Sequence, residues 1–397
     1  MEKNVTAIAL CAVGAEKAVS NELRKLDIKV EDSLYGRVRF KTDIKGLYLA
    51  LIGLRAADRV LLETALFKAA DFDVLFEGAA AVQWERLVPK GMGLKVVKVR
   101  TNRSQLKAET TIQAMVHKAA AQRLCEIYKM NRLPEPGINT QVKTAEVRVY
   151  IEKDVVSLLL DLSGEPLFKR GYRSEGGVAP LRETTAASIL LLSGWKRKFP
   201  LYDPFCGSGT ILIEAAMYAW DMAPGLGRHF AVEDMLIADA EIEKQVREEF
   251  RSKIDFGRLV RIAGSDEDMR SVSIASSNAA RLRDIAEGRE PERGIRVSDG
   301  KSPGIELKVS PMKEARSPFD DSGFIVTNPP YGKRLGDQSM AEEIYREMSG
   351  LGSRFPGWKL AVITDHSGFE SFYGKKADSC REISNGAISS YFFEYNV

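Results

Sequence analysis

Residues 201–220, which read LYDPFCGSGTILIEAAMYAW, constrain the fold more than any other stretch of this chain. A short apolar run ends at Asp203, and a loop with two glycines, Gly207 and Gly209, leads directly into a run typical of a helix. A strand, a tight glycine loop and a helix in succession are typical of the first unit of a parallel sheet. The order strand, loop, helix then recurs, and it predicts a mostly parallel α/β sheet for residues 181–397.

The glycine loop also predicts a ligand site. Glycines at such a turn let the backbone approach a ligand, and the N-terminus of the next helix offers N–H groups to an anion. The loop lacks the third glycine of a dinucleotide fingerprint and the Lys-Ser/Thr pair of a phosphate-binding loop. A ligand with an amino acid moiety fits better, because its carboxylate can lie at the helix N-terminus and its ammonium beside Asp203. S-adenosylmethionine is such a ligand, and a tight turn without a ligand is the alternative. The predicted contacts are Asp203, Pro204, Phe205, Cys206, Gly207, Ser208, Gly209 and Thr210.

Three further acids follow strand-like runs at the same expected sheet edge. Asp266 ends a predicted strand, where such sheets hydrogen-bond a ribose diol, and Asp268 follows two residues later. The glycines precede Asp266 by more than the usual ~20 residues, because a charged helical insertion at roughly 218–257 intervenes. Asp299 follows another short strand-like run and is the candidate for recognising the adenine amine. Each acid alone could instead be a helix N-cap.

A second loop, in the stretch GFIVTNPPYGKRLGD (323–337), places two prolines directly after an apolar run. Neither Pro329 nor Pro330 has an N–H, so a central strand cannot continue through them. Asn328 and Tyr331 bracket the prolines with an amide and an aromatic ring. The sequence therefore predicts a stiff loop at the same sheet edge as the glycine loop.

The front half of the chain reads as two small α+β units, 1–65 and 66–165, followed by a connector at 166–180. Residues 1–175 carry a net charge of +7 and residues 176–397 carry −4, which suggests that the front half meets a polyanion. An exposed strand face, a solvated linker or arginines that pack between domains are the alternatives. The candidate nucleic-acid contacts are basic or aromatic residues: Lys95, Lys98, Arg100, Arg103, Lys169, Arg170, Tyr172, Arg173, Lys333 and Arg334.

Several classes of protein are disfavoured. No apolar run approaches the ~20 residues that span a membrane, and the N-terminus lacks the features of a signal peptide. The four cysteines are scattered and there are three histidines, which argues against a disulfide framework and a metal site. We therefore expect a reduced, metal-free, cytoplasmic protein that does not contact a membrane.

The motifs resemble those of a known family. DPFCGSGTILIEAA and TNPPYG are similar to motifs I and IV of the class I S-adenosylmethionine-dependent amino-methyltransferases. The segment EPLFKRGYR…APLRETTAASIL is similar to the one that precedes motif I in bacterial guanine-N2 RNA methyltransferases with an N-terminal THUMP domain. Residues 66–165 resemble THUMP and residues 1–65 the ferredoxin-like unit before it. The most similar type is the 23S ribosomal RNA guanine-N2 methyltransferase.

The resemblance implies a Rossmann-like sheet of seven strands, the last one reversed, in a methyltransferase domain at 181–397. It implies S-adenosylmethionine contacts from the 203–210 loop, Asp266, Asp299 and Asn328. It also implies that the target amine is bound by Asn328, Pro329, Pro330 and Tyr331, and that the THUMP region grips structured RNA.

The expected partner is 23S rRNA or an assembling large subunit, and a monomer is compatible with the sequence. A transfer RNA substrate, a DNA adenine-N6 methyltransferase and a non-catalytic RNA-binding assembly factor are the alternatives.

Overall fold

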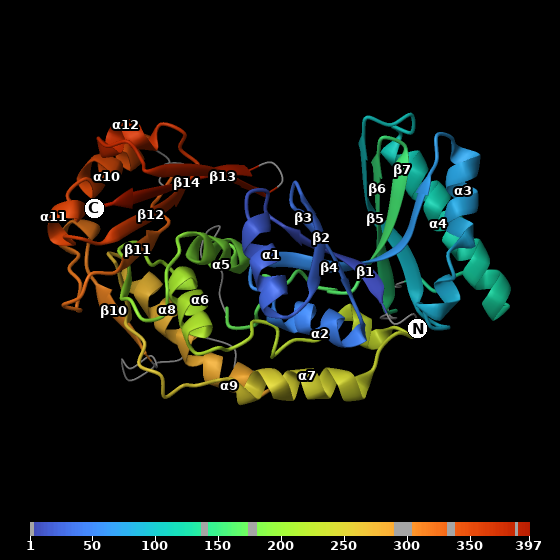
Figure 1. The fold of residues 1–397 in the computed structure, drawn as a ribbon, viewed down its shortest axis with the longest axis horizontal. Coiled ribbons are helices and arrows are strands. Elements are labelled where there is room, and N and C mark those ends of the chain that lie inside the picture. The colour runs from blue at the N-terminus through green and yellow to red at the C-terminus, as the bar shows by residue number, and fades with distance from the viewer. Residues whose placement is uncertain (1–3, 136–141, 174–180, 290–303, 332–337, 386–387) are drawn as a thin grey trace.

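The computed structural model describes residues 4–135, 142–173, 181–289, 304–331, 338–385 and 388–397. It is an elongated α/β molecule with two mixed sheets of seven strands each (Figure 1). The first sheet and its helices come from the front half of the chain, and the second sheet comes from the back half. The largest cluster of buried apolar side chains runs continuously from one half into the other.

The first sheet has the strand order β2-β3-β1-β4-β7-β6-β5. Every neighbouring pair is antiparallel except β5 and β6. Its strands are β1 (Val5–Cys11), β2 (Lys29–Leu34), β3 (Arg37–Thr42), β4 (Ala57–Lys68), β5 (Gly93–Asn102), β6 (Thr144–Glu152) and β7 (Val155–Asp161). A tight turn at Lys153-Asp154, where both residues adopt positive φ, joins β6 to β7.

The long strand β4 joins the two front units. Its first part pairs with β1 and its second part with β7, so the expected boundary between residues 65 and 66 falls inside one strand. The helices of this half are α1 (Glu16–Lys25), α2 (Ile44–Gly53), α3 (Phe72–Ala81) and α4 (Glu109–Tyr128), with a 3-10 turn at Trp84–Arg86. The long helix α4 packs with α3 beside β5 (Figure 1).

The second sheet has the order β10-β9-β8-β11-β12-β14-β13. The first five strands in that order are parallel, and β14 runs antiparallel to both its neighbours, which confirms the predicted sheet. Its strands are β8 (Leu201–Asp203), β9 (Ile262–Asp266), β10 (Ile305–Val309), β11 (Phe324–Thr327), β12 (Lys359–Thr364), β13 (Ser379–Asn385) and β14 (Ile388–Asn396).

Helices flank this second sheet and connect its strands. They are α5 (Glu183–Leu192), α6 (Thr210–Ala219), α7 (Ala240–Ser252), α8 (Met269–Ala280), α9 (Leu282–Ala286), α10 (Gln338–Met348), α11 (Leu351–Arg354) and α12 (Phe369–Tyr373), with 3-10 turns at Ala231–Asp234 and Met312–Glu314. No helix in the described ranges is both long enough and apolar enough to cross a membrane.

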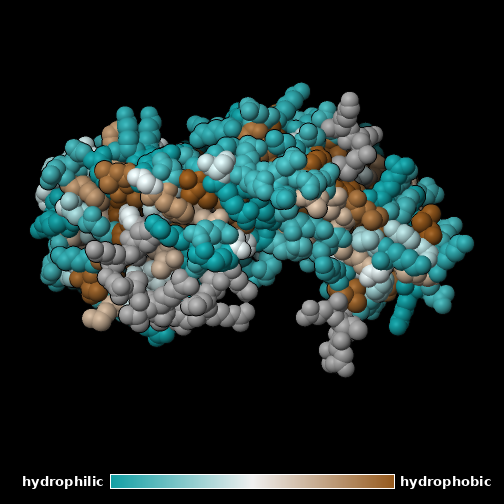
Figure 2. All heavy atoms as spheres, turned by 90° about the horizontal axis from the view of Figure 1, so that it is seen from below, coloured by the Kyte–Doolittle hydropathy of each residue, from teal (hydrophilic) through white to brown (hydrophobic). Residues whose placement is uncertain are grey.

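The insertion between α6 and β9 braces the two halves. Its helix α7 lies along α2 of the front half (Figure 1). The Gly225 amide donates to the Ile52 carbonyl at 2.9 Å, and an added Cβ at Gly225 would lie 2.7 Å from the Ile52 Cα. A second bridge pairs Val13 with Ser384 through two backbone hydrogen bonds. Seen from below, the surface is largely hydrophilic and the outline is hollowed between the two ends (Figure 2).

Candidate active site

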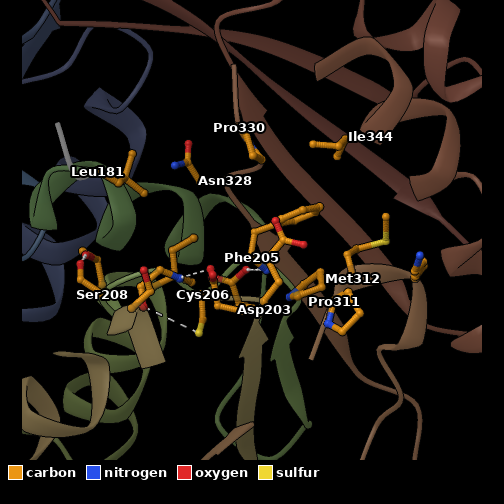
Figure 3. Close-up of a pocket in the computed structure, with 18 of the residues that line it drawn as sticks. Leu181, Asp203, Phe205, Cys206, Ser208, Pro311, Met312, Asn328, Pro330 and Ile344 are labelled. Atoms are coloured by element: carbon orange, nitrogen blue, oxygen red, sulfur yellow. Dashed lines mark hydrogen bonds between the residues drawn. The ribbon is translucent and has the colours of Figure 1, made fainter. Parts of the chain in front are cut away.

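A cavity of about 680 Å³ opens at the carboxyl ends of the parallel strands of the second sheet (Figure 3). The loops after β8, β9, β10 and β11 all contribute to its lining, as expected for a parallel sheet. The predicted residues that line it are Asp203, Pro204, Phe205, Cys206, Gly207, Ser208, Thr210, Asp266, Asn328 and Pro330. The structure thus brings the glycine loop (203–210) and the proline loop (328–331) to one cavity.

The glycine loop is shaped by positive φ angles at Gly207 (+51°) and Gly209 (+82°). The Cys206 amide donates to the Ser265 carbonyl of β9 at 2.9 Å, which ties the loop to the neighbouring strand. Gly209 does not line the cavity, and a Cβ there would lie 2.9 Å from the Ala275 Cβ of α8. Gly209 therefore permits close packing of α6 against α8, while Gly207 forms part of the cavity wall.

Asp203, at the end of β8, is 1% exposed. It accepts hydrogen bonds from the Thr327 hydroxyl at 2.6 Å and the Phe205 amide at 3.0 Å, both on Oδ1. Among the described residues no donor contacts Oδ2, which leaves that oxygen for a donor in the cavity. Burial raises the pKa of Asp203 to about 7, in spite of the two hydrogen bonds. Thr327 directly precedes Asn328, so this bond also fixes β11 to β8 at the site.

Asp266 binds the glycine loop from β9. Its carboxylate accepts the Gly207 amide at 2.9 Å and the Asp268 amide at 3.0 Å, and burial raises its pKa. Asp268 does not line the cavity, and it is the N-cap of α8. Its carboxylate accepts the amides of Arg270 and Ser271 and the Ser271 hydroxyl, which lowers its pKa. The structure thus shows a capping role for Asp268, and the cofactor contact expected there stays a prediction.

The expectation for Asp299 falls on a residue outside the described ranges. On the side away from β8, the neighbour of β9 is β10. The residues after β10 that line the cavity are Pro311, Met312, Lys313 and Glu314. These residues carry no motif in the sequence, and neither does Glu267, which also lines the cavity. A strand assigned at 305–309 would have indicated the first group, because it would end at the same sheet edge.

The proline loop forms the opposite wall. Asn328 and Pro330 line the cavity, and the Tyr331 hydroxyl donates to Asn328 Oδ1. Tyr331 itself is not part of the lining. The Tyr345 hydroxyl of α10 donates to the Pro330 carbonyl at 2.9 Å. Sequence reasoning missed Tyr345 because α10 is separated from the prolines along the chain.

The residues of the cavity fit the expected S-adenosylmethionine. An α-ammonium is a suitable donor for the buried Asp203 carboxylate, and the N-terminus of α6 suits a carboxylate. Asp266 and Glu267 add acceptors for ribose hydroxyls at the end of β9. Asn328 lines the same space as Asp203 and Cys206 (Figure 3).

The predicted basic residues of the front half divide into two groups. Lys95, Lys98 and Arg100 on β5 are exposed, as is Arg103 just after it. Lys98 pairs in register with Arg148 of β6, and partial burial together with the charges of Arg100 and Arg148 lowers its pKa. These side chains form a positive edge of the first sheet. Lys333 and Arg334 fall outside the described residues.

Two residues of the connector that were predicted to contact RNA are buried instead. Lys169 is exposed and pairs with Glu165 at 2.9 Å, but Arg170 and Tyr172 are 2% and 1% exposed. Arg170 forms a buried ion pair with Glu214 of α6 at 3.3 Å, and the Tyr172 hydroxyl donates to the same carboxylate. RNA contacts by Arg170 and Tyr172 are therefore wrong for this fold, because both side chains pack between the domains.

Arg173 is partly buried beside the cavity wall. Its guanidinium donates to the Thr210 hydroxyl at 3.0 Å and the Leu181 carbonyl at 3.1 Å, and it pairs with Glu183 at 3.3 Å. Both Thr210 and Leu181 line the cavity. In this structure the Arg173 side chain supports the wall through these bonds.

Two family models match the chain. Residues 170–290 and 297–392 match the RMKL-like methyltransferase domain, and residues 6–61 match the RlmL ferredoxin-like domain. The chain is 34% identical to "Putative RNA methyltransferase YpsC" of Bacillus subtilis, over 99% of this chain and 96% of that protein. It is 30% identical to "Ribosomal RNA large subunit methyltransferase K/L" of Syntrophotalea carbinolica, over 100% of this chain and 54% of that protein. The chain thus spans about half the length of the second relative.

Two solved structures superimpose on nearly the whole chain. "SMU.472, a putative methyltransferase complexed with SAH" superimposes with a TM-score of 0.84 and 32% identity, covering 100% of this chain and 99% of that one. A "predicted N6-adenine-specific DNA methylase" from Listeria monocytogenes gives a TM-score of 0.84 and 34% identity, covering 99% and 96%.

Proposed function

The chain belongs to the family of RMKL-like methyltransferases, and from that premise we propose that it transfers a methyl group from S-adenosylmethionine to the exocyclic N2 amine of a guanine in 23S rRNA. The observation that carries the proposal is the shared cavity. Asn328 and Pro330 face the same space as Asp203 and the glycine loop, so an amine and a methyl donor can meet there.

The residues of the proline loop position the amine. An exocyclic amine is a poor nucleophile, because its lone pair is delocalised into the base. Hydrogen bonds from the amine to Asn328 Oδ1 and to the Pro329 carbonyl would orient that lone pair and stabilise the positive charge that develops on nitrogen. The Tyr331 hydroxyl occupies Asn328 Oδ1 in this structure, so the amine would replace it.

The bound cofactor supplies an electrophilic methyl group on a sulfonium, with a neutral thioether as leaving group. Transfer to the amine would form a carbon–nitrogen bond and break the carbon–sulfur bond of the cofactor, and the amine proton would be released to water. No strong base is needed, because the methylated amine is acidic. Tyr331 would contribute by stacking on the base after it leaves its helix, which offsets part of an unstacking cost of a few kcal/mol.

The RNA substrate rests on the front half of the chain. We assign residues 1–65 to a ferredoxin-like unit and 66–165 to a THUMP-type RNA-binding module, with the methyltransferase domain at 181–397. Support comes from the exposed basic strand β5 and from two relatives whose names specify RNA. Free 23S rRNA and an assembling large subunit are the proposed partners, and transfer RNA is the second RNA candidate.

Methylation of adenine N6 in DNA is the competing function, because one solved structure of 34% identity is described as a "predicted N6-adenine-specific DNA methylase". The test is incubation of the purified protein with labelled S-adenosylmethionine and separate pools of rRNA, tRNA and DNA. We expect label in 23S rRNA, recovered as N2-methylguanine after digestion. Label only in DNA would refute the RNA proposal. Label only in tRNA would show that the substrate is transfer RNA and not 23S rRNA.

Asn328→Ala tests the role of the loop in the same assay. We expect a loss of transfer of at least a hundredfold with little change in the dissociation constant for the cofactor, because the amide acts on the amine. Unchanged turnover in this variant would exclude the role assigned to the amide.

A further inference from the structure

At two consecutive positions, the backbone of the proline loop can be held by hydrogen bonds only through its carbonyl groups. Pro329 and Pro330 have no N–H, so the backbone there has acceptors and no donors. An external donor must therefore bind a carbonyl if the loop is to hold one position. The Tyr345 hydroxyl provides that donor, at 2.9 Å from the Pro330 oxygen.

Tyr345 is itself held firmly. It is 0% exposed, and its ring packs edge-on against Phe369 at 4.9 Å and His366 at 5.6 Å between centroids. Burial raises its pKa to about 12, so the hydroxyl keeps its proton over the range in which enzymes are assayed.

The hydrogen bonds have a definite direction. A tyrosine hydroxyl has one proton, and Tyr345 gives it to Pro330, so the 3.1 Å contact with Thr364 must be a bond donated by the threonine hydroxyl. Thr364 Oγ1 in turn accepts the His366 amide at 3.1 Å. The chain of bonds runs from the end of β12 through Tyr345 to the proline loop, and such chains reinforce their members.

We propose that Tyr345 is a positioning residue for methyl transfer, and that its hydroxyl, oriented by Thr364, fixes the Pro330 carbonyl and with it the Asn328–Pro330 segment that faces the cofactor. This inference rests on the proposed function. Tyr345 contacts neither reacting group, so its effect is on the geometry of the residues that do. A displacement of about 1 Å at such a loop is enough to lower a rate by about a hundredfold.

Tyr345→Phe removes the hydroxyl and keeps the ring. We expect kcat for RNA methylation to fall at least tenfold, with the dissociation constant for S-adenosylmethionine and the melting temperature nearly unchanged. The matched control is Tyr373→Phe, because Tyr373 is also buried, packs on the same Phe369 and, within the described residues, makes no hydrogen bond to the proline loop. The control should keep kcat within twofold of the wild type.

Thr364→Val and Thr364→Ser test the same series of hydrogen bonds at the end opposite to the proline loop. The valine variant should lower kcat threefold or more, the serine variant should restore it, and the double variant Tyr345→Phe/Thr364→Val should be no slower than Tyr345→Phe. Wild-type kcat in Tyr345→Phe, or equal losses in Tyr345→Phe and Tyr373→Phe, would overturn the inference. A wild-type protein that methylates no nucleic acid would instead refute the proposed function.

Discussion

At the scale of single residues, Asp203 makes cofactor binding depend on pH. Burial raises its pKa to about 7, so it is mostly neutral at pH 6 and mostly ionised at pH 8. The ionised form is the one that attracts a cationic ligand. We expect the dissociation constant for S-adenosylmethionine, measured by calorimetry, to be roughly tenfold higher at pH 6 than at pH 8, because only the ionised fraction binds.

Asp203→Asn is the control for this titration. The amino group of the ligand titrates identically in both proteins, so the difference between them isolates Asp203. The variant should bind more weakly at pH 8 and lose the part of the pH dependence that Asp203 causes. Parallel pH profiles for the two proteins would show that Asp203 does not control binding.

At the scale of elements, the two glycines of the loop before α6 have separable tasks. Each has positive φ, so an alanine at either position costs about 1–2 kcal/mol of backbone strain. A Cβ at Gly209 also meets α8 at 2.9 Å, whereas a Cβ at Gly207 meets no described protein atom within 4 Å and stands at the cavity wall. The two substitutions should therefore fail in different ways.

Gly209→Ala should lower the free energy of unfolding more than Gly207→Ala, because α6 or α8 must shift. Gly207→Ala should weaken cofactor binding at least tenfold with the smaller loss of stability, because its Cβ enters the space of the ligand. Urea denaturation and calorimetry on both variants measure the two quantities. The reverse order of effects would contradict the assignment of Gly207 to the cavity wall and Gly209 to helix packing.

The strand β5 gives a second prediction at this scale. Lys98→Gln/Arg100→Gln removes two exposed positive charges next to Arg148. If they contact phosphates, the affinity for a 23S rRNA transcript should fall and the slope of log K against log salt should decrease by about 1.5. Cofactor affinity should stay constant. The charge-matched control is Lys17→Gln/Lys244→Gln, on helices α1 and α7, and equal effects of both pairs would refute a specific role for β5.

The elements that sequence predicted well are those whose signal is local. The Asp203–Thr210 loop and the Asn328–Pro330 segment are contiguous motifs, and all their residues except Gly209 and Pro329 line the cavity. Thr327 and Tyr345 were missed because their roles depend on partners, Asp203 and Pro330, that only the folded sheet brings near.

Errors arose where a residue type is compatible with two environments. Arg170 and Tyr172 have the composition of an RNA-binding segment, but exposure decides between that role and packing, and composition does not report exposure. Asp268 shows the same ambiguity, because an acid that follows a strand can bind a ligand or cap the next helix, and in the structure it caps α8.

At the scale of the whole molecule, a network of buried hydrogen bonds and one ion pair joins the front half to α6, the helix that follows the glycine loop. Arg170 pairs with Glu214 of α6 and donates to the Arg55 carbonyl at 2.5 Å. The Arg55 side chain donates to the Met222 carbonyl at 2.7 Å, and Glu22 of α1 accepts the Arg55 amide at 3.0 Å. The helix that begins at the glycine loop is thus bonded to the ferredoxin-like unit, which shares the first sheet with the module proposed to bind RNA.

Arg170→Met should therefore destabilise the whole protein, by about 3–5 kcal/mol, because it leaves the Glu214 carboxylate buried without its partner. Lys169→Met is the adjacent control and should change stability by at most about 1 kcal/mol, because its ion pair with Glu165 is exposed. The measurement is urea denaturation. Adding Glu214→Met to Arg170→Met should recover part of the loss, since no lone charge then remains. If Arg170→Met were as stable as Lys169→Met but bound RNA more weakly, the buried network would not join the halves and Arg170 would belong to the RNA surface after all.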